Sequence, residues 1–182
     1  MHQCIRWALV GWVGAGAGLW SAVGALAAED WNACAMLQKA DVDAALAPRK
    51  FDQGTPGRAV VKSSPNMAAV SSCTYTSRGA TARDTVTVTL VARRAPNDAS
   101  GVTPQTARDG AVKLKATPVD VDGLGAGAYW VNLGSSAFPV IELNVFRGKR
   151  EWLVFSVGAR TLDTQVALAG LKKIANGVAG RL

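Results

Sequence analysis

Histidine is the side chain that most often serves as a general base or as a ligand for zinc and haem iron. This chain of 182 residues contains one histidine, His2. It precedes residues 7–28, an uncharged stretch typical of an export signal that is removed on processing. The processed chain would therefore contain no histidine. This excludes Ser-His-Asp and Cys-His catalysis, histidine-bound metals and histidine-based pH sensing.

The chain also contains three cysteines, Cys4, Cys34 and Cys73. Cys4 precedes the uncharged stretch and would leave with it. In an oxidising compartment the remaining pair predicts one disulfide, Cys34–Cys73, in a small domain. The alternative is a redox couple, but the two residues do not form a C-x-x-C pair and no neighbouring group would lower a thiol pKa. We therefore interpret the pair as a structural crosslink.

Residues 123–127 have the sequence GLGAG, and glycines can let backbone amides approach a phosphate. A phosphate-binding loop of this kind needs a strand before it and a helix after it. Here a strand-like segment, AYWVNL, follows, so we predict a glycine-rich turn. The run 120–123, DVDG, suggests calcium, but it lacks the further oxygen ligands and the terminal glutamate of a calcium loop. We predict no cofactor and no metal site.

Serine and lysine are the remaining residues that could support nucleophilic catalysis. Lys62 is followed by Ser63 and Ser64, and a Ser-Lys dyad requires the lysine to be desolvated against the serine. Adjacent residues of an extended segment point to opposite faces, so this arrangement is not favoured. We predict no catalytic residues, and we expect the protein not to be an enzyme.

A basic cluster lies in the run FRGKREW, where Arg147, Lys149 and Arg150 are flanked by Phe146 and Trp152. Cations beside aromatics can grip a nucleic-acid strand or an anionic lipid or glycan head group. Strand alternation could equally turn the two aromatics into the core and leave a solvated basic turn, which we favour. We keep Arg147, Lys149, Arg150 and Trp152 as a candidate contact with an anion or a partner. The net charge of +7 favours acidic partners, with no specific nucleic acid implied.

Residues 1–28 fit a signal peptide, with Arg6 before the uncharged stretch and the small residues ALAA at its end. The stretch is long enough to span a bilayer, but its many glycines and its Ala-x-Ala site favour cleavage over a retained anchor. Residues 31–33, WNA, do not form a lipobox before Cys34. We therefore predict a signal peptide over 1–28 and a single domain over 29–182. This places the protein in the periplasm or outside the cell, with no stable membrane insertion after processing.

The first half of the mature chain predicts a helix followed by strands. Residues 31–46 are rich in helix formers, with Asn32 as the N-cap and Pro48 after the end. A short strand is expected over 59–62. The segments 69–77 and 84–94 alternate in polarity, as in strands with one buried face.

The second half predicts a helix, four strands and a closing helix. The helix covers 104–115, capped by Thr103 and with Pro104 at its first position. The strands are expected over 119–121, 127–133, 139–146 and 151–158, and the closing helix over 162–182. Short turns between neighbouring strands predict an α+β fold, with a single, largely antiparallel sheet, helices packed on one face and one disulfide.

Three short motifs, CAMLQKADVDAAL, CTY and GLGAGAYW, follow one another in this order. In this the chain resembles a widespread class of small exported bacterial proteins and lipoproteins of unknown function, a class similar to the extracellular sensor domains of some actinobacterial serine/threonine kinases. The resemblance implies an α+β fold with a Cys34–Cys73 disulfide and a binding or sensing role without catalytic residues. The chain departs from the lipoprotein members by lacking a lipobox. The matching residues are Cys34, Leu37, Asp41, Val42, Cys73, Tyr75, Gly123, Leu124, Gly125, Ala128, Tyr129 and Trp130.

These patterns favour a non-catalytic, exported binding or sensing module that contacts another envelope protein or an anionic envelope component. The alternative is a carrier of a small amphipathic or anionic ligand held between the sheet and the helices, and an enzyme of unfamiliar type comes third. A closed core with an exposed apolar patch would favour the first function. An open cavity of several hundred Å³ would favour the carrier.

Overall fold

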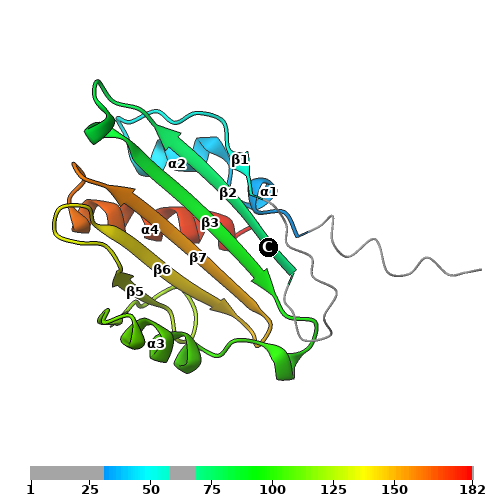
Figure 1. Cartoon of the computed structure of the whole chain (residues 1–182). Coiled ribbons are helices and arrows are strands. Elements are labelled where there is room, and N and C mark those ends of the chain that lie inside the picture. Colours follow the sequence, from blue (N-terminus) through cyan, green and yellow to red (C-terminus); the bar gives the residue numbers. More distant parts are fainter. Residues whose placement is uncertain (1–30, 58–68, 182) are drawn as a thin grey trace, which may run out of the picture.

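The computed structural model of the chain describes residues 31–57 and 69–181 (Figure 1). The predicted signal peptide, the short strand over 59–62 and the Lys62 to Ser64 segment lie outside these residues.

A single antiparallel sheet of seven strands forms the centre of the described fold, in the order β1-β2-β3-β7-β6-β5-β4. The chain builds one half of the sheet up to β3 and then starts the other half at its far edge, so that β7 returns to pair with β3 (Figure 1). The antiparallel α+β fold predicted from the sequence is confirmed. The strands are β1 Thr55–Pro56, β2 Ala69–Ser77, β3 Val86–Arg94, β4 Val119–Asp120, β5 Tyr129–Asn132, β6 Val140–Arg147 and β7 Glu151–Ala159.

The helices are α1 Ala33–Met36, α2 Lys39–Ala45, α3 Pro104–Lys113 and α4 Thr164–Ala179, with single 3-10 turns at Ala82–Asp84 and Asp98–Ser100. The prediction of one helix over 31–46 is wrong, because the chain adopts extended dihedrals at Leu37 and Gln38. The hydroxyl of Tyr75 donates to the Leu37 carbonyl, and the Asp41 carboxylate accepts from the Gln38 amide at 3.0 Å. These two bonds satisfy the backbone at the break, so the segment can turn there.

The first face of the sheet, which we call the closed face, carries the main core. The alternation of β3 is confirmed, since Val86, Val88 and Leu90 are fully buried there. Helices α1, α2 and α4 cover this face (Figure 1), and the apolar side chains Leu168, Leu171, Ile174 and Val178 of α4 are buried against it. The predicted disulfide is also confirmed: Cys34 of α1 is bonded to Cys73 of β2, with the two Cα atoms 4.9 Å apart.

The second face of the sheet, which we call the open face, carries only α3 among the described helices. Ala107 and Ala111 of this helix pack against Tyr129 and Phe146, which project from β5 and β6 away from the main core. The expectation that all helices share one face is therefore wrong for α3. A second apolar cluster on β5 and β6 provides the surface on which this helix packs.

Candidate functional site

A cleft of about 430 Å³ lies between α3 and the open face of the sheet. The helix begins at the cap that the sequence predicted, where the Thr103 hydroxyl oxygen accepts from the Thr106 amide at 3.1 Å. Small side chains of α3, Ala107 and Ala111, pack against the sheet and also line the cleft. The cleft is lined by Val102, Thr106, Ala107, Gly110, Ala111, Leu114, Tyr129, Leu133, Glu142 and Trp152.

A row of stacked side chains runs beside the cleft across five elements, α3, β5, β6, β7 and β3. The rings of Tyr129 and Phe146 stack with centroids 6.2 Å apart, and those of Phe146 and Trp152 stack at 5.9 Å. A guanidinium closes each end: Arg108 lies 4.6 Å from the Tyr129 ring centroid and Arg93 lies 4.5 Å from that of Trp152. A cation placed above an aromatic ring is attracted by the negative face of the ring. Tyr129 and Trp152 of this row line the cleft and give it an aromatic wall.

A chain of hydrogen bonds leads from this row to a carboxylate. The Trp152 indole Nε1 donates to Asn144 Oδ1 at 2.9 Å, and Asn144 Nδ2 donates to Glu142 Oε1 at 3.0 Å. An indole can only donate and a carboxylate can only accept, so these partners fix the orientation of the fully buried Asn144 amide. These two hydrogen bonds thereby hold the Glu142 carboxylate in place at the cleft.

The phenol of Tyr129 lines the cleft from the sheet, as the Glu142 carboxylate does. Burial is the main cause that raises the pKa of Tyr129 to about 12; the negative charge of Glu142 contributes in the same direction and the positive charge of Arg108 opposes it. The hydroxyl is therefore protonated at neutral pH and can act as a hydrogen-bond donor. The arrangement suits apolar contact and hydrogen bonding to a bound molecule.

The rim of the cleft is apolar and exposed to solvent. Leu114 of α3 is 72% exposed, and Val102 and Leu133 are 38% and 39% exposed. Exposed apolar side chains that gather around a concavity commonly mark a binding site.

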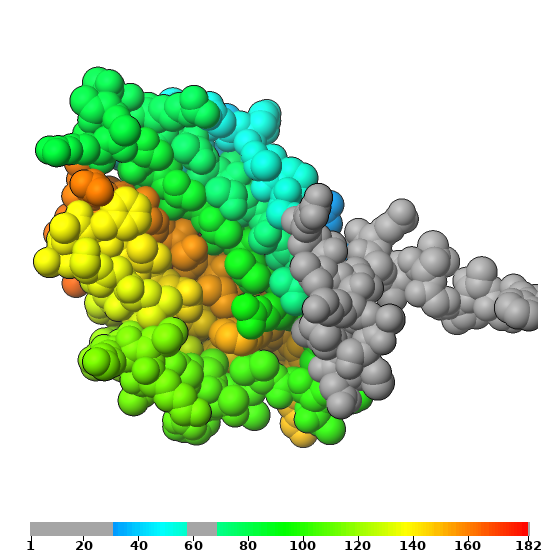
Figure 2. Space-filling model, viewed as in Figure 1, coloured from blue at the N-terminus to red at the C-terminus, as the bar shows by residue number. Residues whose placement is uncertain are grey.

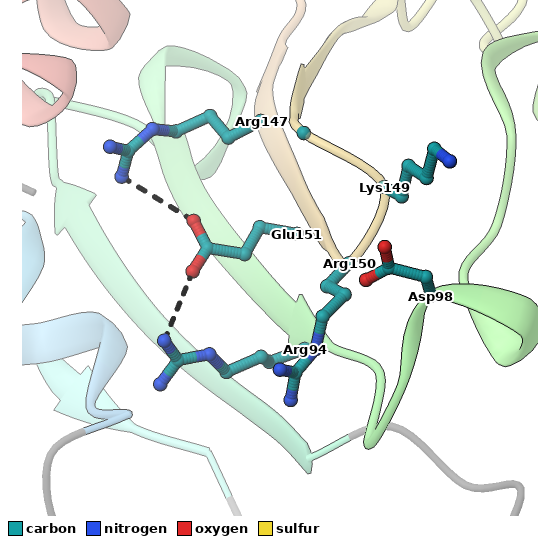
Figure 3. A pocket seen from close by; sticks show the side chains of 7 residues that line it. Arg94, Asp98, Arg147, Lys149, Arg150 and Glu151 are labelled. Carbon is teal, nitrogen blue, oxygen red and sulfur yellow. Dashed lines mark ion pairs between the residues drawn. The ribbon is translucent and has the colours of Figure 1, made fainter.

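The basic turn between β6 and β7 is the site predicted from the sequence, and the structure brings its three cations together. Arg147, Lys149 and Arg150 line a hollow of about 460 Å³ with Arg94, Asp98, Gly148 and Glu151 (Figure 3). The Glu151 carboxylate pairs with Arg94 at 3.3 Å and with Arg147 at 3.5 Å. Arg150 Nε donates to the Ala95 carbonyl at 2.9 Å. The two carboxylates therefore offset part of the positive charge, and Lys149 points away from the Glu151 pairs (Figure 3).

Trp152 is not part of this basic hollow. Arg147 and Glu151 are paired across the hairpin, and the next residue of β7 points to the opposite face because strand side chains alternate. Trp152 consequently lines the cleft under α3, together with Glu142. Glu142 is not among the site residues predicted from the sequence. The available signal was its period-two spacing with Asn144 and Phe146, which places a carboxylate, an amide and an aromatic on one face of an otherwise apolar strand.

The glycine-rich run forms a turn, as predicted. Gly123, Gly125 and Gly127 have φ values of +81°, +94° and +79°, and strand β5 follows directly. A Cβ at Gly127 would lie 2.6 Å from Pro104 Cβ, so glycine is required for this turn to pack against the start of α3. Asp120 pairs with Arg108 at 2.6 Å. Within residues 31–57 and 69–181, no three His, Cys, Asp or Glu side chains gather as metal ligands would, and no helix is long and apolar enough to cross a membrane.

Comparison with known proteins identifies a similar solved structure. No protein-family model matches the chain. No curated protein matches it. Among solved structures, the chain is similar to the extracellular domain of PknH from Mycobacterium tuberculosis, with 13% sequence identity and a TM-score of 0.47, over 80% of this chain and 94% of that domain. The wider class of small exported proteins named from the sequence motifs stays a prediction.

Proposed function

We propose that the protein is a non-catalytic binding module of the cell envelope that holds a small amphipathic molecule in the cleft between α3 and the sheet. The cleft itself carries this proposal. Its volume of about 430 Å³ lies within the roughly 300–1,000 Å³ of typical small-molecule sites. Its walls combine apolar side chains with two polar groups at fixed positions, Tyr129 and Glu142.

The location in the envelope is supported by two features. The Cys34–Cys73 disulfide is typical of proteins that fold in an oxidising compartment. Residues 1–28 have the sequence pattern of a signal peptide. A binding role is supported by the chemistry of the cleft walls, which offer contact surface and hydrogen bonds to a ligand.

The proposal is tested by a fluorescent apolar probe, N-phenyl-1-naphthylamine, whose emission rises in an apolar site. We expect saturable binding with one probe per chain. A Cβ at Gly110 would meet nothing within 4 Å, so Gly110→Phe can place its ring in the cleft without a clash at Cβ. This variant should lose at least about 90% of the saturable signal through simple exclusion.

Val112→Phe is the matched control, because Val112 lies on the same helix, is 58% exposed and does not line the cleft. It should bind the probe as the unmodified protein does. Unchanged binding by Gly110→Phe, with both variants folded by circular dichroism, would remove the support for a ligand site under α3.

A second candidate function is contact with an acidic surface of another envelope protein, the function that the sequence patterns favoured first. The exposed Lys149 and Arg150 at the basic turn support it. A Lys149→Glu/Arg150→Glu variant should then fail to retain a specific partner from an envelope extract, while the partner is retained by the unmodified protein at low salt.

The control for this capture is Arg78→Glu/Arg83→Glu, which makes the same change in charge at the other end of the sheet, in the turn between β2 and β3. If both double variants retain the same proteins as the unmodified chain, the basic turn is not the contact.

A further inference from the structure

We infer that the molecule held under α3 carries an amine head that binds the carboxylate of Glu142 as an ammonium ion. This inference rests on the proposed function and specifies the chemical class of its ligand: an amphipathic amine with an apolar tail.

Glu142 is the only charged residue among the described side chains that line the cleft. It forms no ion pair with any of the residues that the structure describes. Its one side-chain hydrogen bond there comes from Asn144, and a carboxylate offers about four acceptor positions. Glu142 therefore has acceptor capacity for a ligand in a cleft whose other walls are largely apolar.

The neighbouring cations are engaged elsewhere. Arg108 pairs with Asp120 at 2.6 Å, donates to the Gly127 carbonyl at 3.2 Å and stacks on Tyr129. Arg93 stacks on Trp152 at the far end of the aromatic row. Neither arginine lines the cleft. The half-buried Glu142 carboxylate has no charged partner among the described residues, and an ammonium ion in the cleft would supply one.

The carboxylate is also held ready for such a head group. Asn144 is fully buried and bonded on both sides, to Trp152 and to Glu142, so its position is set by packing as well as by hydrogen bonds. A fixed acceptor loses little conformational freedom on binding. The exposed apolar rim at Leu114 and Val102 provides contact surface for the tail of the ligand.

The overall charge of the protein makes this inference sharply testable. The chain has a formal net charge of +7, so long-range electrostatics favour anionic ligands. If the cleft prefers a cationic ligand, that preference must therefore come from a group in the cleft itself, the Glu142 carboxylate. Decylamine, decanol and decanoate share the same tail length and differ in their heads, which are cationic, neutral and anionic at pH 7. Each is titrated below its aggregation concentration against the protein loaded with N-phenyl-1-naphthylamine.

We expect decylamine to displace the probe at least about tenfold more tightly than decanol, which is the range of a hydrogen bond to a charged group. Decanoate should bind most weakly, because it meets the Glu142 carboxylate. In Glu142→Gln the preference of decylamine over decanol should fall to within about twofold. Glu151→Gln removes a carboxylate outside the cleft and should keep the full preference.

The outcomes separate this inference from the proposed function. If decanol or decanoate binds as tightly as decylamine, the inference is wrong while the cleft is still a ligand site. The inference is also wrong if Glu142→Gln keeps the tenfold preference. If none of the three displaces the probe, the inference is wrong; the proposed function fails separately, if Gly110→Phe binds the probe as the unmodified protein does. The series on the unmodified protein decides the head-group preference even if Glu142→Gln does not fold.

Discussion

The two faces of the sheet bury their side chains in different ways. On the closed face, three helices and the disulfide cover β2, β3, β6 and β7, and large side chains such as Phe155, Leu171 and Ile174 are at most 1% exposed. On the open face, one helix with alanines toward the sheet packs on β5 and β6, and β7 is visible between β3 and β6 in Figure 2. The same strands therefore have a sealed core on one side and a cleft on the other.

One polar group on each face illustrates the same difference. On the closed face, the buried Tyr75 hydroxyl donates to the Leu37 carbonyl, so its hydrogen bond is satisfied within the chain. On the open face, the hydrogen bonds from Trp152 through Asn144 end at Glu142, which faces the cleft. We therefore interpret the closed face as the source of stability and the open face as the binding surface.

The largest effect should come from the crosslink of the closed face. In the variant Cys34→Ala/Cys73→Ala, the denatured chain regains the freedom lost in a loop whose ends are 39 residues apart. The free energy of unfolding, measured by guanidinium denaturation, should fall by about 4 kcal/mol. The single variant Arg83→Ala, at an exposed turn, serves as the control and should change it by less than about 0.5 kcal/mol. A loss below about 1 kcal/mol for the double variant would contradict the role of the crosslink.

A pair of identical substitutions compares the faces directly. Leu171 of α4 is fully buried on the closed face, and Leu114 at the end of α3 is 72% exposed at the cleft. Leu171→Ala should lower the free energy of unfolding by about 2–5 kcal/mol, since it leaves a cavity. Leu114→Ala should change it by no more than about 0.5 kcal/mol. Equal losses in the same denaturation assay would show that the cleft rim is part of the stabilising core.

The helix caps provide a smaller contrast. The Asp163 carboxylate accepts from the Gln165 and Val166 amides at the start of α4, and the Thr103 hydroxyl caps α3. Each change to alanine should cost about 1 kcal/mol. Hydrogen exchange should then locate the losses differently: Asp163→Ala weakens protection across the closed face, and Thr103→Ala weakens it in α3 alone. Loss of protection across the whole sheet in Thr103→Ala would show that the two faces unfold together.

The smallest effect concerns the two tyrosines, one on each face. Burial raises the pKa of Tyr75, and burial with the charge of Glu142 raises that of Tyr129 to about 12. An unfolded tyrosine titrates near pH 10, so the stability due to Tyr129 is complete below about pH 10 and is lost as the pH rises through about 12. In a Tyr75→Phe background, tyrosinate absorbance should report Tyr129 alone. Adding Glu142→Gln should lower its midpoint, and an unchanged midpoint would mean that the two groups are not neighbours.

Much of the fold follows from local patterns in the sequence. Three confirmed features follow from neighbouring residues: the alternation of β3, the hairpin of β6 and β7, and the Thr103 cap. The confirmed pairing of Cys34 with Cys73 follows from the number of cysteines in the processed chain. The break at Leu37 was only partly predictable in this way. The bond between the Gln38 amide and the Asp41 carboxylate is local, but the Tyr75 hydroxyl that donates to the Leu37 carbonyl is distant in sequence.

The candidate site was less predictable for a related reason. Strand β6 has apolar residues on both faces, Leu143 on one and Phe146 on the other, so its pattern does not say which face a helix covers. The crossing of the chain from β3 to the far edge decides that α3 packs on the open face. The cleft and the position of Glu142 in it exist only once that crossing is made.

The most direct test of ligand binding on the open face maps the binding of decylamine by two-dimensional amide NMR of the isotopically labelled protein. We predict shifts in α3, in β5 and β6 near Tyr129 and Glu142, and in the indole N–H of Trp152. The indoles of Trp31 and Trp130, which pack against the main core, should not shift. Shifts centred on the closed face or on the basic turn, or no shifts at saturating decylamine, would contradict a ligand site under α3.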